Sequence, residues 1–154
     1  MLENPHITQT DVQLTAAIRL TIKREEIRNV MGPGITELMT TVAVQGIGPA
    51  GPWLTHHLRM DPEIFDFEIC VPVTAAVTPV GRVAPSQLPA ARVARAIYIG
   101  PYEGLSDAWR EFDEWMQANG HVGGSELWEV YVAGPETGPD SSKFRTELNH
   151  PLES

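Results

Sequence analysis

Apolar and polar residues alternate with a period of two near the start of the chain. The apolar positions of residues 12–22 share one parity: Val12, Leu14, Ala16, Ile18, Leu20 and Ile22. Successive side chains of a strand point to opposite faces, so this pattern predicts a β-strand with one buried face. Shorter strand-like segments follow at residues 53–60, 64–73, 91–100, 126–133 and 144–152. The chain is therefore expected to be rich in strands.

Two other stretches repeat apolar residues at helical spacing. The clearer one runs from Leu105 to the stop signal at Asn119-Gly120, and charged residues cover its other side. Its apolar stripe consists of Leu105, Ala108, Trp109, Phe112, Trp115 and Met116. The other predicted helix carries Ile35, Leu38, Met39 and Val42. We expect it to begin after residues 32–34, Gly-Pro-Gly, because these residue types interrupt helices.

The order strand, helix, strand, strand occurs twice. Leu38 aligns with Ala108, Trp53 with Trp128 and Glu68 with Glu147, and the spacing between the copies grows only inside loops. We therefore predict an α+β fold of duplicated βαββ units with pseudo-twofold symmetry. Its antiparallel sheets would be packed by two helices around a central groove. The single domain, 1–154, would hold repeat one at about 11–73, a Pro-rich connector at about 74–90 and repeat two at about 91–152.

Charge and composition narrow the function classes. The 154 residues carry a formal net charge of -9 and no dense basic cluster, so direct nucleic-acid binding is not expected. No apolar run reaches the roughly 18 residues that span a bilayer, and no targeting segment is recognisable. We expect a cytoplasmic protein without a membrane segment. The single cysteine, Cys70, and the pair His56-His57, which we expect to be solvated, suggest no metal site and no cofactor.

Glu129 interrupts an apolar run that extends from Leu127 to Tyr131. Burying a carboxylate is costly, so its side chain either reaches water or faces something that favours a negative charge. In a strand, Glu129 and Tyr131 share one face, and Trp128 and Val130 share the other. We expect the second helix to pack on the Trp128 face, which would point Glu129 into the groove. Its counterpart in repeat one would be Leu54.

The second half contains a set of short motifs: Tyr98-Ile99-Gly100-Pro101-Tyr102-Glu103-Gly104-Leu105, Trp115, Trp128-Glu129-Val130-Tyr131, Thr146-Glu147-Leu148 and Pro151-Leu152. As a set they resemble the motifs of the GyrI-like small-molecule-binding family, which also supplies the effector-binding domain of AraC-type and MerR-type multidrug regulators. The resemblance extends from about Val12 to Leu152 and implies a duplicated fold with a central ligand groove. It also implies aromatic rings around an acidic residue at the position of Glu129. The stretch Leu148-Asn149-His150-Pro151 departs from the family, which often has more apolar residues there.

The candidate ligand-binding residues combine one carboxylate with aromatic rings. They are Glu129, Tyr131, Tyr98, Trp53, Trp109, Tyr102 and Glu147. An aromatic cage with a carboxylate suits a lipophilic cation, because ring faces attract cations. Desolvation should raise the pKa of Glu129 unless a cation offsets it. Glu147 aligns with Glu68, so a structural or groove-edge role is preferred for it.

Three functions fit these residues and the family resemblance, and small-molecule binding is the preferred one. The first is a stand-alone protein that binds a hydrophobic, cationic or drug-like small molecule, with Glu129 as the counter-charge. The second is the alternative that the resemblance implies, because some stand-alone members of the family hydrolyse strained cyclopropane-bearing compounds. It is a hydrolase of cyclopropane-type electrophilic toxins, in which Glu129 orients or deprotonates water and Tyr131 assists by hydrogen bonding. The third is an interaction module for a protein partner such as a regulator or gyrase.

Overall fold

The computed structural model describes residues 2–153, which form an α+β fold of antiparallel strands and two α-helices. The chain divides into two compact units. The first unit comprises Asp11–Ala90. The second unit begins at Ala91 and also includes the N-terminal segment that ends at Thr10. No helix in the described part of the chain is long and apolar enough to span a membrane.

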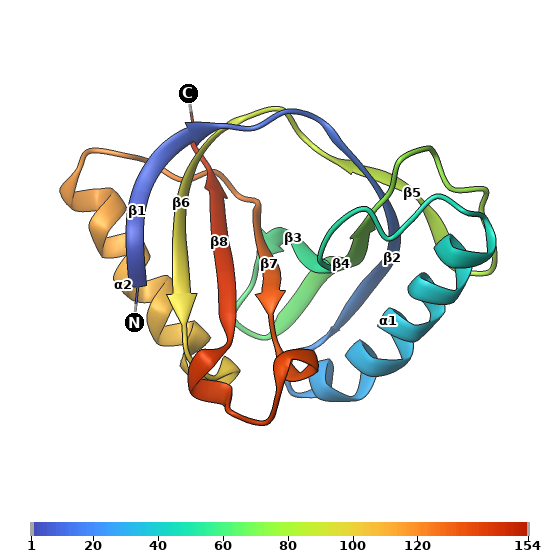
Figure 1. Cartoon of the computed structure of the whole chain (residues 1–154). Coiled ribbons are helices and arrows are strands. Elements are labelled where there is room, and N and C mark those ends of the chain that lie inside the picture. The colour runs from blue at the N-terminus through green and yellow to red at the C-terminus, as the bar shows by residue number, and fades with distance from the viewer. Residues whose placement is uncertain (1, 154) are drawn as a thin grey trace. The chain divides into compact units, whose positions relative to one another are not determined.

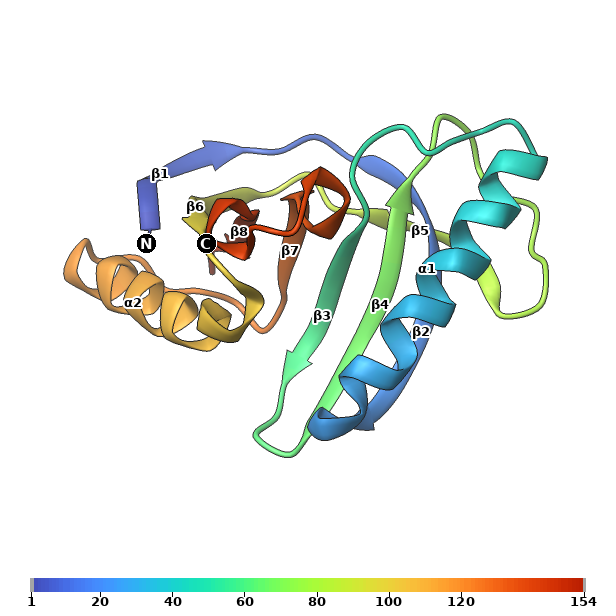
Figure 2. The ribbon, with the colours of Figure 1, turned by 60° about the horizontal axis from the view of Figure 1, so that its bottom comes forward.

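The first unit is a four-stranded sheet with one helix (Figure 1). Its order is β3-β4-β2-β5, and its bounds are β2 (Gln13–Lys23), β3 (Leu54–Met60), β4 (Ile64–Pro72) and β5 (Val83–Leu88). A 3₁₀ turn, η1 (Arg24–Glu26), leads into α1 (Ile27–Val44), which lies along β2 and β4 (Figure 2). The core of this unit joins helix residues such as Leu38 to strand residues such as Ile18 and Phe67.

The second unit repeats this arrangement. Its order is β1-β6-β8-β7, and its bounds are β1 (Leu2–Gln9), β6 (Arg92–Ile99), β7 (Leu127–Ala133) and β8 (Arg145–Pro151). The turn η2 (Tyr102–Gly104) precedes α2 (Leu105–Ala118), and the turns η3 (Pro135–Thr137) and η4 (Ser141–Lys143) lie between β7 and β8. Ala108, Phe112 and Met116 of α2 pack on Ala96 and Leu148 of the sheet.

The edge strands are exchanged between the two copies. In chain order, β1 precedes β2 but pairs with β6, whereas β5 precedes β6 but pairs with β2. The predicted strands of both repeats and the helix at 105–118 are confirmed. The sequence did not predict β1, where the positive φ of Asn4, the adjacent Pro5 and a register shift break the alternation. The strand β5 falls inside the predicted connector, and its Pro85 is tolerated because β5 is an edge strand.

The prediction that Gly-Pro-Gly at residues 32–34 precedes the first helix is wrong, because α1 begins at Ile27 and continues through it. Gly34 is buried, and a Cβ at this position would lie 2.6 Å from Cδ1 of Ile69. The glycine therefore allows the helix to approach the sheet closely and does not end it. Gly32, by contrast, has nothing within 4 Å of such a Cβ.

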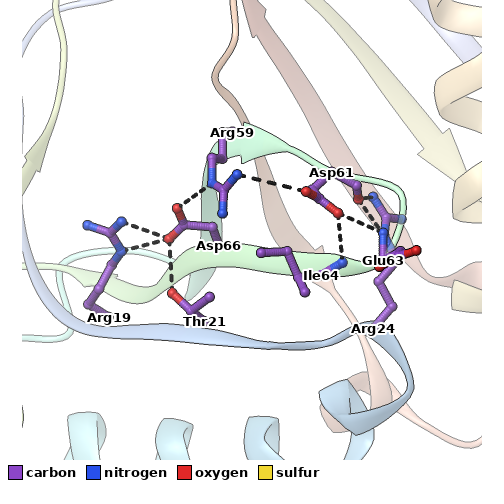
Figure 3. Close-up of polar contacts among 8 residues, drawn as sticks. All are labelled: Arg19, Thr21, Arg24, Arg59, Asp61, Glu63, Ile64 and Asp66. Atoms are coloured by element: carbon purple, nitrogen blue, oxygen red, sulfur yellow. Dashed lines mark hydrogen bonds and ion pairs between the residues drawn. The ribbon is translucent and has the colours of Figure 1, made fainter.

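A polar network on Asp66 joins three strands of the first unit (Figure 3). The carboxylate of Asp66 on β4 accepts hydrogen bonds from Arg19 of β2 at 2.7 and 3.0 Å and from Arg59 of β3 at 3.0 Å. The Thr21 hydroxyl donates to it at 3.3 Å. The Arg19 hydrogen bond is the main cause that lowers the pKa of Asp66, and Arg59 adds to it against the opposing effect of burial. In the turn between β3 and β4, Asp61 accepts two backbone N–H groups, at 2.8 and 3.2 Å.

Candidate functional site

Glu129 lies on the face of the sheet that α2 covers. It is directly opposite Leu148 on β8, and Leu148 is opposite Ala96 on β6. Directly opposed residues share a face, and both Leu148 and Ala96 belong to the core under α2. The prediction that α2 packs on the Trp128 face is therefore wrong. Alternation could not decide this, because Trp128 is also buried, with 2% of its surface exposed.

Two neutral donors hold the carboxylate of Glu129. The indole Nε1–H of Trp109 on α2 donates to Oε1 at 2.6 Å, and the hydroxyl of Tyr131 donates to Oε2 at 2.6 Å. Within residues 2–153, no Lys, Arg or His forms an ion pair with Glu129. Burial raises the pKa of Glu129, while the hydrogen bonds from Tyr131 and Trp109 act in the opposite direction. The result is a partly buried carboxylate without a counter-ion from the described chain.

Aromatic rings extend the site on the Tyr131 side. The ring of Tyr102 in η2 lies edge-on to Tyr131, with centroids 5.7 Å apart, and 5.3 Å from the ring of Phe144. Burial is the main cause that raises the pKa of Tyr102, and the charge of Glu129 contributes. The Tyr102 hydroxyl abuts Gly134, where any Cβ would collide with it. Phe144 was not singled out from the sequence, because it directly follows a polar loop.

The structure brings four predicted residues together: Glu129, Tyr131, Trp109 and Tyr102. Tyr98 is buried in the core under α2. Its hydroxyl donates to the Pro101 carbonyl at 2.7 Å and so fixes the turn before α2.

Glu147 is not beside Glu129. It lies on the opposite face of β8, where it accepts a hydrogen bond from Asn149 at 3.1 Å and lies 3.4 Å from Nε of Arg95. Trp53 precedes β3 in the first unit, so a role for it beside Glu129 stays a prediction.

The pairing of the strands gives Glu129 a counterpart in the first unit that differs from the predicted Leu54. Glu147 is opposite Val130, and its aligned partner Glu68 is opposite His56. Val130 and His56 are therefore equivalent. Glu129 precedes Val130 by one residue, as Thr55 precedes His56, so Thr55 is the counterpart of Glu129. The prediction of Leu54 is therefore wrong by one residue.

The same count makes His57 the counterpart of Tyr131. His57 Nε2 lies 3.2 Å from the hydroxyl of Thr55, so the first unit repeats the contact with uncharged groups. The prediction that His56 and His57 are solvated is wrong, because both are buried, and His57 stacks on Phe67 at 5.3 Å. Burial lowers its pKa to about 4, with smaller effects from nearby charges, so it is neutral at pH 7. Only the second unit carries a carboxylate at this position.

Residues 2–153 contain no group of three or more His, Cys, Asp or Glu side chains that could hold a metal ion. A surface depression of about 580 Å³ lies where the loop before β7 meets the end of β8. It is lined by Gly123, Gly124, Ser125, Glu126, Pro151, Leu152 and Glu153, and does not include Glu129.

Comparison with known proteins places this geometry in context. The family described as GyrI-like small molecule binding domain matches residues 14–153. A search of curated proteins found no match. The EcmrR C-terminal domain is a similar solved structure, with 20% identity, a TM-score of 0.85 and 98% of each chain covered. The chain spans only 57% of the EcmrR chain in its complex with DNA.

Two further structures share the fold at lower identity. SAV2435, solved with tetraphenylphosphonium bound, is 12% identical, with a TM-score of 0.65 and coverage of 99% of this chain and 95% of that one. A structure described as a hydrolase from Listeria innocua is also 12% identical, with a TM-score of 0.69 and coverage of 97% and 91%. At these identities the likeness shows the fold alone.

Proposed function

The chain belongs to the GyrI-like family of small-molecule-binding domains, and we propose that its second unit binds a hydrophobic cation with Glu129 as the counter-charge. One observation carries the proposal. Glu129 is held among aromatic side chains by two neutral donors and has no cationic partner among residues 2–153. A carboxylate in such surroundings is stabilised by any cation that can reach it.

The neutral donors suit this role. The N–H of Trp109 and the O–H of Tyr131 favour the ionised form of Glu129 without neutralising its charge. The charge stays available to a ligand, and the rings of Trp109, Tyr131 and Tyr102 supply apolar surface and faces that attract cations by roughly 0.5–2 kcal/mol each. A bulky organic cation can use both features, whereas a small hydrated cation gains little from the rings.

Tetraphenylphosphonium is a suitable probe, because SAV2435, which shares this fold, was solved with it bound. Calorimetric titration at pH 8 should compare the wild type with Glu129→Gln. Removing one partner of a partly buried charge pair costs roughly 2 kcal/mol or more, so the substitution should weaken binding by at least about tenfold.

The matched control for this titration is Glu147→Gln. It removes the same charge from the same unit, but on the opposite face of β8, where Glu147 pairs with Arg95. We expect it to bind tetraphenylphosphonium like the wild type. Equal affinities for wild type and Glu129→Gln would rule out the counter-charge role.

A hydrolytic function is the second candidate, because the same carboxylate has the features of a general base. Its pKa is raised by burial, and the Tyr131 hydroxyl lies 2.6 Å from Oε2. In this reaction the water oxygen would bond to a carbon of a strained ring, and Glu129 would take the water proton. The ring bond would break with its electron pair passing to the electron-withdrawing part of the toxin, which then takes up a proton to give the ring-opened product. The fold is shared with a structure described as a hydrolase.

Incubation with a cyclopropane-containing alkylating agent tests the second candidate. Hydrolysis predicts a ring-opened product above the buffer rate for the wild type and a loss of about 100-fold or more for Glu129→Gln, within the range of general base catalysis. Product formation at the buffer rate by the wild type, together with tight binding of tetraphenylphosphonium, would leave binding as the function.

A further inference from the structure

The His150 ring on β8 faces acceptor oxygens with both of its nitrogens. Nε2 lies 2.9 Å from the carbonyl oxygen of Gly124, and Nδ1 lies 3.6 Å from Oδ1 of Asp113 on α2. The side chain is 13% exposed. The loop before β7 packs closely against the His150 ring, and a Cβ on Gly123 would collide with it.

This geometry fits an imidazolium ion. A neutral imidazole carries one N–H and one acceptor nitrogen, so one of its nitrogens would face an oxygen lone pair without a proton. Burial lowers the pKa of His150, but the contact with Asp113 and the Gly124 carbonyl raise it by more, so the pKa lies above 6.5. The charged ring then ties α2 to β8 and to the loop before β7.

Trp109 lies between this ring and Glu129. Its ring centroid is 6.0 Å from that of His150, with the planes at 79°, and its indole N–H donates to Glu129. Asp113 is one helical turn after Trp109, on the same helix. A contact series therefore leads from Asp113 through His150 and Trp109 to the carboxylate.

We propose that His150, paired with Asp113, is a positioning residue that orients Trp109 toward Glu129 and so strengthens cation binding at Glu129. This inference rests on the proposed function of the site. His150 lies in the stretch of residues 148–151 that departs from the family pattern, and this role explains why a histidine occupies the position. We call the His150–Asp113 pair the latch.

The pH dependence of the latch follows from its charges. Below the raised pKa of His150 the ring is the charged imidazolium. As the pH rises through the raised pKa, Nδ1 loses its proton and faces Asp113 with a lone pair, so the latch loosens. The charged groups facing His150 are Asp113 from α2 and, beyond Trp109, Glu129 from β7, while its neighbour on β6 is the uncharged Ala94. While the imidazolium is present, Asp113 largely cancels its charge, so under these conditions the latch acts through orientation of the indole.

The first test follows the indole ¹H–¹⁵N resonance of Trp109, assigned by its loss in Trp109→Phe. In the wild type its position should change between pH 6 and pH 9. In His150→Gln only the part of this change that comes from the titration of Glu129, the acceptor of the indole N–H, should remain. In Asp113→Asn the midpoint of the part that comes from His150 should move to lower pH. A Trp109 resonance that does not change with pH in the wild type, or that changes equally in His150→Gln, would overturn the proposal.

The second test measures the affinity for tetraphenylphosphonium. His150→Gln and Asp113→Asn should each raise Kd three- to tenfold at pH 6, and the ratio to the wild type should fall to about one at pH 9. Taking the ratio at each pH removes the titration of Glu129 itself. Asp107→Asn is the control, since Asp107 is an exposed residue of α2 paired with Arg110. A ratio of one at pH 6 for both latch variants would contradict the inference.

The two tests separate the inference from the proposed function. If tetraphenylphosphonium does not bind the wild type, the proposed function fails, and cation binding at Glu129 fails with it. The Trp109 resonance then still decides whether the latch orients the indole. If the ligand binds and Glu129→Gln weakens it, but the latch variants behave like the wild type in both tests, only the role of His150 is excluded.

Discussion

Two side chains, Trp109 and Tyr131, donate hydrogen bonds that stabilise the ionised form of Glu129. Removing one of these donors should therefore weaken cation binding at Glu129. Tyr131→Phe deletes the hydroxyl that lies 2.6 Å from Oε2. A hydrogen bond to a charged group contributes about 1.5–3 kcal/mol, so we expect the affinity for tetraphenylphosphonium at pH 7 to fall about tenfold. Calorimetry on both proteins measures this. Tyr98→Phe is the control, because its hydroxyl donates to Pro101 instead; an equal loss in both variants would contradict the assignment.

The ionised carboxylate of Glu129 should also lower the free energy of unfolding of the protein at neutral pH. Its pKa in the folded protein is raised above 4.5, so the stability linked to its protonated form is present below pH 4.5 and lost as the pH rises through the folded pKa. We expect Glu129→Gln to melt at or above the wild-type temperature at pH 8, with a shift of about 2–4 °C per kcal/mol. The advantage should shrink toward pH 4.5. Thermal melts from pH 4.5 to 8 decide this, and a variant that is less stable at pH 8 would contradict it.

Helix α1 contains two glycines that should respond differently to substitution. Gly34→Ala places a Cβ 2.6 Å from Cδ1 of Ile69, and such overpacking costs about 1–3 kcal/mol. Gly32→Ala meets no residue outside its own helix and chain neighbours within 4 Å. Its gain in helix propensity, about 0.5–1 kcal/mol, is opposed by the ring of Pro33, which crowds the Cβ of the preceding residue, so its net effect should be small. Urea unfolding of the two variants measures both free energies. If Gly34→Ala is no more destabilising than Gly32→Ala, close packing of α1 on β4 is not the reason for Gly34.

The strands β2, β3 and β4 share the Asp66 network, which should make the first unit sensitive to acid. The pKa of Asp66 is lowered below 3.8, chiefly by the Arg19 hydrogen bond, so its stabilisation is present above pH 3.8 and lost as the pH falls through the folded pKa. Asp66→Asn should lower the melting temperature by a few degrees at pH 7 and have progressively less effect at lower pH. Asp107→Asn, which breaks an exposed pair on α2, should change little. A difference between wild type and Asp66→Asn that does not vary with pH would contradict this explanation.

Most elements could be predicted from the sequence, because their patterns arise from one buried face. The stripe of α2 and the parity of β2 are such cases. Three elements were not predicted correctly. The strand β1 was missed because its alternation is broken, and two others because a residue has a tertiary role: Gly34 serves packing inside α1, and Pro85 is accommodated on the edge strand β5. Three predicted residues, Tyr131, Trp109 and Tyr102, lie near Glu129, but the face of the sheet on which Glu129 lies was predicted wrongly. Both faces of β7 carry buried apolar residues, Leu127 and Tyr131 on one face and Trp128 on the other. The alternation of the sequence therefore does not distinguish the face beneath α2.

At the scale of the whole molecule, duplication separates structural roles from functional ones. The two units have the same strand order and each has one helix, yet the contact between Glu129 and Tyr131 in one unit is replaced by Thr55 and His57 in the other. A residue needed only for the fold should suit both copies. The carboxylate appears in one copy, where it destabilises the protein unless something compensates, and this asymmetry is the main reason to assign it to a ligand.

Proton release on ligand binding tests the counter-charge claim most directly. A cation beside Glu129 lowers its pKa, so binding must expel a proton near the raised pKa of the free protein. Titration of tetraphenylphosphonium at pH 5 to 6, in buffers that differ in ionisation enthalpy, counts the protons released. We predict a fractional release by the wild type that fades by pH 8 and is absent in Glu129→Gln. Binding with no release by the wild type, or with equal release by both proteins, would contradict the proposal that Glu129 is the counter-charge.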